Sequence, residues 1–167
     1  KTEAWTAYSE NPSKWTGVQV TSKGMDKLLC ITNDGIRYIA LGILYSDVDF
    51  RVVLSSTDGS TWTKLGVSEV SDVESRVCFG SISSGVYAGV YGFNKYSLSD
   101  DAVAWNLNGI AGLPSGKFPY LNGICFGDGR LVAVGNVIAV SESGRADLSY
   151  LGEVDQSVLN DVCHKGV

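Results

Sequence analysis

The stretch that decides the fold is STDGSTW, Ser56–Trp62, near the middle of the chain. Asp-Gly is a strong signal for a tight turn, and the run VVLSS just before it has the composition of a strand. The same spelling returns as SENPSKW at Ser9–Trp15, as SDDAVAW at Ser99–Trp105 and, without its Trp, as SESGRAD at Ser141–Asp147. The four serines stand 47, 43 and 42 residues apart, a period that indicates repeated supersecondary units.

The four cysteines follow the same period. Cys30, Cys78, Cys125 and Cys163 follow successive repeat serines by 21, 22, 26 and 22 residues, so each occupies one position of the unit. Equivalent positions in neighbouring units are usually farther apart than the roughly 4.4–6.8 Å between Cα atoms that a disulfide requires. We therefore expect four reduced cysteines that lie buried in strands.

Each unit contains four short β-rich runs. They are KLLCIT, IRYIALG, RVVLSS and TWTKLG in one unit, RVCFGS, GVYAGV, KYSLS and AWNLN in the next, and NGICF, RLVAV, VIAVS and LSYL in the last. No stretch has helical apolar spacing over ten or more residues. Four antiparallel strands in about forty residues are typical of a β-propeller blade.

We therefore expect an all-β chain that forms a single β-propeller domain over residues 1–167, with about four blades. The blades are expected at 23–68, 74–109 and 120–152, with a further blade built from both ends, 161–167 and 1–22. A fragment of a larger propeller is the alternative, because the two ends together are slightly short for four strands.

Composition excludes several classes of function. The net charge is −5 and no basic cluster is present, which argues against nucleic-acid binding. The sequence contains no run of eighteen apolar residues, so it does not predict membrane insertion. With a single His and scattered acidic residues, the sequence predicts neither a metal site nor a cofactor.

The SxDGxTW spelling resembles the Asp-box of bacterial neuraminidases and, more closely, the repeats of propellers in phage tail or fibre proteins and bacterial surface proteins. The resemblance implies that each box is the turn between the third and fourth strands of a blade. Its Ser and Asp would hydrogen-bond the turn backbone, and its Trp would pack between strands. The structural repeat residues so implied are Ser9, Asn11, Trp15, Ser56, Asp58, Trp62, Ser99, Asp101, Trp105 and Ser141.

Neuraminidase chemistry would need three arginines on the substrate carboxylate, a Tyr nucleophile paired with a Glu, and an acidic Asp. The arginine motif that opens that fold is absent. Arg37 and Arg130 follow equivalent turns of two units, which favours solvated positions beside those turns. We expect no catalytic residues and no enzyme activity.

Ligand binding is expected on the side of the blades opposite the box turns, where the connecting segments are longer and irregular. Aromatic rings with Asp and Asn suit sugar recognition, although the same rings could only pin the loops to the blades. Asp47 and Asp49 could also bind a hard cation, but two acidic residues are a weak signal. The candidate ligand-binding residues are Tyr45, Asp47, Asp49, Phe50, Tyr91, Phe93, Asn94, Phe118 and Tyr120.

The sequence thus favours a non-catalytic binding module of a phage tail or fibre, on the virion or on a bacterial or extracellular surface. The expected partners are a host-surface glycan or receptor and other virion proteins, with a homo-oligomer formed through the parent protein. A structural propeller that mediates protein–protein contacts is the first alternative. A glycan-cleaving, sialidase-like enzyme is the second.

Overall fold

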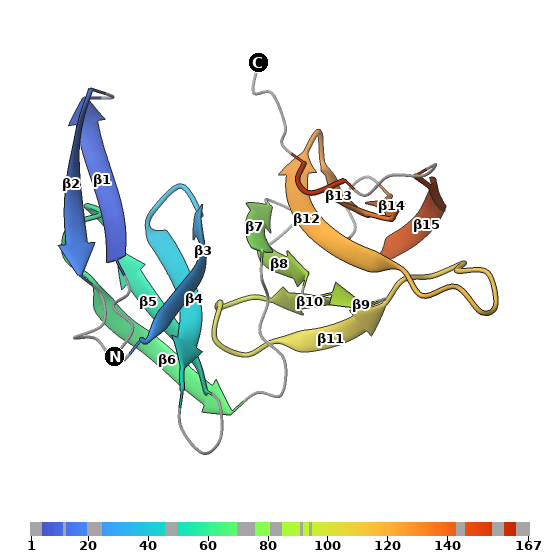
Figure 1. Cartoon of the computed structure of the whole chain (residues 1–167), viewed down its shortest axis with the longest axis horizontal. Coiled ribbons are helices and arrows are strands. Elements are labelled where there is room, and N and C mark those ends of the chain that lie inside the picture. The colour runs from blue at the N-terminus through green and yellow to red at the C-terminus, as the bar shows by residue number, and fades with distance from the viewer. Residues whose placement is uncertain are drawn as a thin grey trace. The chain divides into compact units, whose positions relative to one another are not determined.

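The computed structural model describes residues 5–11, 13–19, 25–45, 50–69, 76–80, 85–90, 92–93, 95–142, 146–154 and 159–162. These residues form strands, turns and extended segments, and no helix occurs among them. It follows that the described part of the chain holds no helix able to cross a bilayer. The strands form four antiparallel sheets, which confirms the all-β class (Figure 1).

The chain divides into two compact units, residues 1–73 and 74–167. The first unit contains a two-stranded sheet and a four-stranded sheet, the latter in the order β3-β4-β5-β6. The strands of this unit are β1 (Trp5–Asn11), β2 (Lys14–Gln19), β3 (Lys27–Asn33), β4 (Tyr38–Leu44), β5 (Phe50–Ser56) and β6 (Thr63–Glu69). Strands that neighbour in sequence also neighbour in each sheet, so both sheets are simple meanders.

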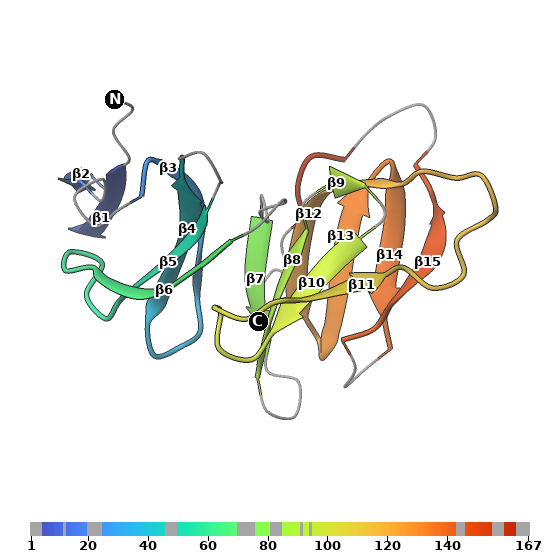
Figure 2. The same ribbon diagram turned by 90° about the horizontal axis from the view of Figure 1, so that it is seen from below.

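The second unit contains two larger sheets, ordered β11-β10-β8-β7 and β15-β14-β13-β12-β9 (Figure 2). Without β9, each is again a four-stranded meander. The strands are β7 (Arg76–Gly80), β8 (Val86–Val90), β9 (Gly92–Phe93), β10 (Lys95–Ser99), β11 (Asn106–Gly109), β12 (Tyr120–Gly127), β13 (Arg130–Gly135), β14 (Val137–Ser141) and β15 (Leu148–Glu153).

Every β-rich run of the three complete repeats falls on a strand, and the four runs of each repeat lie side by side in one antiparallel sheet. The turn at Asp128-Gly129 joins β12 and β13 with positive φ at both residues, 50° and 73°, as a two-residue hairpin requires. The sequence did not predict β9, which leaves the sheet of β8 and β10 and pairs with β12 of the neighbouring sheet.

The core of the second unit lies between its two sheets. One apolar cluster includes Val86, Ala88 and Val90 of β8 together with Leu131 and Ala139 of the other sheet. The two sheets are also joined by hydrogen bonds. The buried Tyr96 hydroxyl accepts a hydrogen bond from the Leu148 backbone N–H at 3.1 Å, and burial raises the pKa of this Tyr. The two sheets of this unit therefore stack face to face.

The box turn at Ser56–Trp62 lies between β5 and β6 and is closed by its own side chains. Asp58 Oδ1 accepts hydrogen bonds from the N–H groups of Ser60 and Thr61 at 2.8 and 2.7 Å. Ser56 Oγ accepts the Gly59 N–H at 2.8 Å, and Trp62 Nε1 donates to the Gly59 carbonyl at 3.0 Å. These contacts satisfy backbone groups that have no strand partner.

The turn at Ser99–Trp105, between β10 and β11, repeats this geometry. Asp101 Oδ1 accepts the N–H groups of Val103 and Ala104, both at 2.8 Å. Ser99 Oγ accepts the Ala102 N–H at 2.9 Å, and Trp105 Nε1 donates to the Ala102 carbonyl at 2.9 Å. Two different sequences therefore form one turn, because they share Ser, Asp and Trp at the same offsets.

Ala102 stands where the other turn has Gly59, and it keeps the same left-handed conformation. Its φ is 67°, against 73° at Gly59. An L-residue with a side chain pays about 1–2 kcal/mol for this conformation. The hydrogen bonds of Ser99 and Trp105 to the Ala102 backbone hold it there, so this turn carries local strain that the Gly59 turn avoids.

The other two copies of the motif are less regular. β1 extends to Asn11 and β2 begins at Lys14, so the first copy encloses a shorter turn; the side chains of Ser9, Asn11 and Trp15 are not described. In the fourth copy, Ser141 Oγ accepts the Leu131 N–H of β13 at 2.8 Å. The residues after it, 143–145, lie outside the described part of the chain.

The box tryptophans differ in burial. Trp62 is 2% exposed and belongs to a core cluster with Met25, Ala40, Val52 and Leu54. The equivalent Trp105 is only half-buried. The same motif thus contributes a core side chain to one sheet and a boundary side chain to the other.

Cys30, Cys78 and Cys125 all lie in the first strand of their sheets. Cys30 and Cys125 are reduced, as expected. Both are half-buried, so the expectation that they are buried was wrong for these two. Each has a partner residue on one neighbouring strand only, Leu41 for Cys30 and Val132 for Cys125. The side chain of Cys78 is not described, and Cys163 lies outside the described residues.

Trp62→Ala is expected to lower the free energy of unfolding of the first unit by about 3–5 kcal/mol, the usual cost of removing a large aromatic side chain from a core. Trp5→Ala is the matched control, because Trp5 is 52% exposed in the same unit. Thermal unfolding followed by circular dichroism measures both. Equal melting temperatures for the two variants would contradict a core role for Trp62.

Gly59→Ala is expected to destabilise the protein by about 1–2 kcal/mol, because it introduces the left-handed strain that Ala102 already carries. Ala102→Gly should be nearly neutral, since relief of strain offsets the lost methyl group and the greater chain entropy of Gly. The control Ala139→Gly, at a buried strand position, should be clearly destabilising. Chemical denaturation measures the free energy of unfolding of the three variants. A large loss of stability in Ala102→Gly would contradict the strain assigned to this turn.

The acid stability of the box turns should depend on Asp58. Hydrogen bonds from the Thr61 and Ser60 backbone N–H groups hold the pKa of Asp58 far below its usual value of 3.8. A lowered pKa in the folded state means stability that is present above about pH 4 and is lost as the pH falls through the lowered value. The melting temperature of Asp58→Asn should therefore lie below that of the parent protein at neutral pH. The difference between the two melting temperatures should become smaller in acid. Asp100→Asn, an exposed neighbour of the other turn, should show no such difference.

Candidate functional site

The edge of sheet β12–β15 opposite its hairpin at Asp128-Gly129 gathers several of the predicted ligand-binding residues. β12 begins there at Tyr120, β13 and β14 are joined there around Asn136, and β15 ends there at Glu153. β9 adds Phe93, which pairs directly with Tyr120 in the ladder. Two irregular segments that are separate in sequence, those with Phe93 and with Phe118, thus meet at one edge.

Asn136 organises this edge through its backbone and its side chain. Its Oδ1 accepts the Tyr120 N–H at 2.6 Å, and its own N–H donates to the Tyr120 carbonyl at 3.1 Å. Its Nδ2 donates to the Phe118 carbonyl at 3.5 Å, and its carbonyl accepts the Val154 N–H at 3.1 Å. One side chain therefore holds the segment that carries both aromatic residues.

Gly135 allows this close approach. A Cβ at this position would lie 1.6 Å from the Tyr120 carbonyl oxygen, so any side chain would push the Tyr120 segment away. The role of Asn136 could not be read from sequence, because its partners lie 16 and 18 residues away.

The side chains held at this edge are exposed. Phe118 is 74% exposed and Tyr120 is 43% exposed, with the buried Pro119 between them. Lys117 Nζ pairs with Glu153 Oε1 at 2.6 Å, and this hydrogen bond raises the pKa of Lys117. We call the set of Lys117, Phe118, Tyr120, Asn136 and Glu153 the Phe118 surface. It combines two rings with charged groups on a fixed backbone.

The other predicted ligand-binding residues are described less completely. Tyr45, in the first unit, is 50% exposed, and its N–H donates to Asp26 Oδ2 at 3.1 Å. Phe50 begins β5 and Phe93 lies in β9, but their side chains are not described. Asp47, Asp49, Tyr91 and Asn94 lie outside the described residues.

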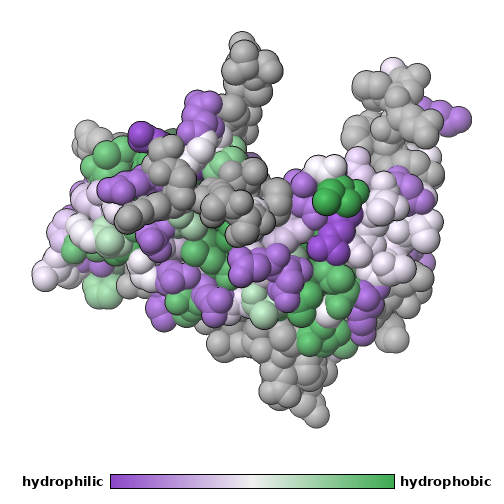
Figure 3. All heavy atoms as spheres, turned by 180° about the vertical axis from the view of Figure 1, so that it is seen from behind, coloured by the Kyte–Doolittle hydropathy of each residue, from purple (hydrophilic) through white to green (hydrophobic). Residues whose placement is uncertain are grey.

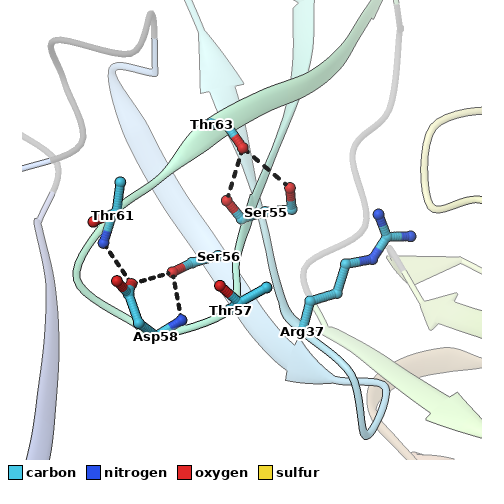
Figure 4. A pocket seen from close by; sticks show the side chains of 7 residues that line it. All are labelled: Arg37, Ser55, Ser56, Thr57, Asp58, Thr61 and Thr63. Atoms are coloured by element: carbon cyan, nitrogen blue, oxygen red, sulfur yellow. Dashed lines mark hydrogen bonds between the residues drawn. The ribbon is translucent and has the colours of Figure 1, made fainter.

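A pocket of about 320 Å³ lies on the box side of sheet β3–β6, where no ligand was expected (Figure 4). Each of its lining residues has a polar side chain: Arg37, Ser55, Ser56, Thr57, Asp58, Thr61 and Thr63. Asp58 and Ser56 already bind the turn backbone, and Arg37 Nε pairs with Asp34 Oδ2 at 3.2 Å. Three of the seven lining side chains are therefore already engaged in the two adjoining turns.

The arginines that a neuraminidase site would need occupy different settings. Arg37 pairs with Asp34 beside a turn, Arg51 is 6% exposed within β5, and Arg130 is exposed in the other unit. The side chain of Arg76 is not described, and Arg145 lies outside the described residues. In the described part of the chain, no three His, Cys, Asp or Glu residues gather as metal ligands would.

Exposed apolar side chains occur elsewhere, so exposure alone does not define a site. Ile36 is 82% exposed and Leu151 is 69% exposed. Figure 3 shows hydrophobic groups separated by hydrophilic ones on the face it presents. What distinguishes the Phe118 surface is that one residue, Asn136, hydrogen-bonds the backbone at both ring-bearing positions.

Comparison with known proteins identifies no family for this chain: no protein-family model matches it, and no curated protein matches it.

Proposed function

We propose that this chain is a non-catalytic binding module whose Phe118 surface contacts a bacterial surface glycan or receptor, as part of a phage tail or fibre. The proposal rests chiefly on one observation, the 74% exposure of Phe118 on a segment held by Asn136. An exposed ring on a fixed backbone loses little entropy when a ligand covers it.

The chemistry of the surface fits a sugar. The face of an aromatic ring can pack on the apolar face of a sugar ring, while its edge and its polar tip remain in water. Lys117 and Glu153 lie beside the rings and can exchange hydrogen bonds with hydroxyl groups. The net charge of −5 makes a polyanionic partner such as nucleic acid unfavourable.

The contrast between the two edges of the sheets supports this assignment. The turns at Ser56–Trp62 and Ser99–Trp105 share their length, their hydrogen bonds and their Ser, Asp and Trp, so their backbone shape does not vary between these sheets. The opposite edge differs from sheet to sheet, from a short turn at Asn136 to the longer connection that follows Tyr45. Variable segments on a rigid frame are where specificity usually arises.

The repeated meanders are best explained as blades of a propeller built on Asp-box turns, with about four blades in one ring or in part of a larger one. In each complete repeat the four strands lie in sequence order, and the sheets of two repeats share a core in residues 74–167. A propeller would carry the Phe118 surface on the side opposite the boxes. It would also suit the alternative of a structural module that contacts only other proteins.

Phe118→Ala with Tyr120→Ala is expected to weaken attachment to bacterial cells or to an arrayed surface glycan by about tenfold or more, because truncating an anchoring aromatic usually costs at least 1–2 kcal/mol. The melting temperature should stay near that of the parent. The matched control is Leu151→Ala, because Leu151 is an apolar residue of sheet β12–β15 that is 69% exposed.

Three outcomes would contradict the proposal. The parent protein could bind no cell or glycan, which would favour the structural alternative. The double variant could bind as well as the parent, which would exclude the Phe118 surface. Release of sugar from a fluorogenic glycoside by the parent chain would identify an enzyme.

A further inference from the structure

We propose that the second face of sheet β12–β15 is a docking face for the chain's own C-terminal segment, which starts at Leu159 and forms the first strand of a further sheet. We call this the open face; its residues are Gly123, Cys125, Val132, Val134, Ile138 and Val140. The proposal concerns an internal interface and stands whether or not the Phe118 surface binds a glycan.

The register of the sheet separates its two faces. Ile124, Ala133 and Ala139 are aligned across the strands and belong to the core shared with sheet β7–β11. Cys125, Val132 and Val140 form the row on one side of it, and Gly123, Val134 and Ile138 form the row on the other side. Because side chains alternate along a strand, these two rows point away from the shared core.

The open face is as apolar as the covered one. RLVAV in β13 and VIAVS in β14 are nearly continuous apolar runs and do not alternate between apolar and polar residues. Continuous runs are typical of strands that are buried on both faces, whereas a sheet with one solvated face alternates. The composition of β13 and β14 therefore predicts that something covers the open face.

The path of the chain indicates what covers it. Residues 159–162 lie at the beginning of the sheet, beside the start of β12 (Figure 1). The Leu159 N–H donates to the Gly135 carbonyl at 2.9 Å, and Asn122 Nδ2 donates to the Leu159 carbonyl at 3.1 Å. The chain thus arrives beside β12, the first strand of the sheet.

Gly123 provides the room for this arrival. A Cβ on Gly123 would lie 2.8 Å from Asp161 Cα and 3.1 Å from the Val162 nitrogen, so residues 161–162 cross the open face in direct contact with the β12 backbone. Val134, directly opposite Gly123, is 4% exposed. Val132 and Val140, in the next row, are only half-buried. The segment therefore covers the row that it crosses, and the next row remains partly open.

The segment has the sequence of a first strand. Leu159-Asn160-Asp161-Val162-Cys163 repeats the pattern Leu121-Asn122-Gly123-Ile124-Cys125 at the start of β12. Because the segment is tethered to the sheet, its effective concentration at the open face is far higher than that of any second copy. These observations together favour the chain's own C-terminal segment as the occupant.

Cys163 reports on the segment without any substitution. Its native-state labelling by iodoacetamide, followed by peptide mass spectrometry, should be at least about tenfold slower than in the denatured chain, because a docked strand protects its thiol. Labelling of Cys163 at the rate of the denatured chain would overturn the proposal. Protection that disappears on dilution, together with dissociation of a dimer in sedimentation, would also overturn it, because a second copy would then be the occupant.

Gly123→Ala should raise the labelling rate of Cys163 by about tenfold, because the new Cβ displaces Asp161. Gly152→Ala is the matched control in the same sheet, since nothing lies within 4 Å of a Cβ there. Cys30, in the other unit, should label at an unchanged rate in both variants.

If Gly123→Ala unfolds the second unit, Val134→Thr gives the same test with a nearly isosteric residue in the row that the segment crosses. It should also raise the labelling rate of Cys163, because a hydroxyl weakens apolar packing there. An unchanged rate in folded Gly123→Ala, or in Val134→Thr, would exclude docking on this face.

Discussion

The box turn, in which an Asp and a Ser side chain replace missing backbone partners, is the interaction on which these sheets depend. A connection of six residues between two strands leaves N–H groups without ladder partners, and water can solvate only the exposed ones. Asp58 and Ser56 supply the acceptors, and Trp62 returns a donor to the Gly59 carbonyl. The turn thereby fixes the third strand against the fourth and aims the Trp at one face of the sheet. The Ala102 copy shows that this hydrogen-bonding set outweighs the conformational preference of an L-residue.

The regularity of the box turns leaves the opposite edge as the place where sheets differ. In the second unit that edge is organised by Asn136, whose amide and backbone hold both sides of the Tyr120 segment. The sheet that carries this edge is itself held by the core, because Tyr96 and the shared apolar cluster join it to sheet β7–β11. A rigid frame with one variable edge is a physical basis for a binding module, since specificity can change there without loss of the core.

The continuous apolar runs of β13 and β14 give sheet β12–β15 an apolar side on both of its faces. One face of sheet β12–β15 is buried against sheet β7–β11. On the other face, Asp161 and Val162 lie directly against Gly123. A meander of four strands with two apolar faces cannot be stable alone in water, so it needs neighbours on both sides. Repetition of the unit along the chain is one way to supply them.

The sequence by itself determined the repeat, the all-β class and the strands of the three complete repeats, because turn chemistry and strand composition are local properties. It also located the two regular box turns, whose partners lie within three residues of each other. Tertiary structure alone decided the rest. The short strand β9 has little local signal and exists because β12 offers it an edge. The meeting of Phe93 with Tyr120, the role of Asn136 and the contact of Asp161 with Gly123 all join residues far apart in the sequence. Composition and spacing cannot encode such contacts, because they depend on how whole sheets pack.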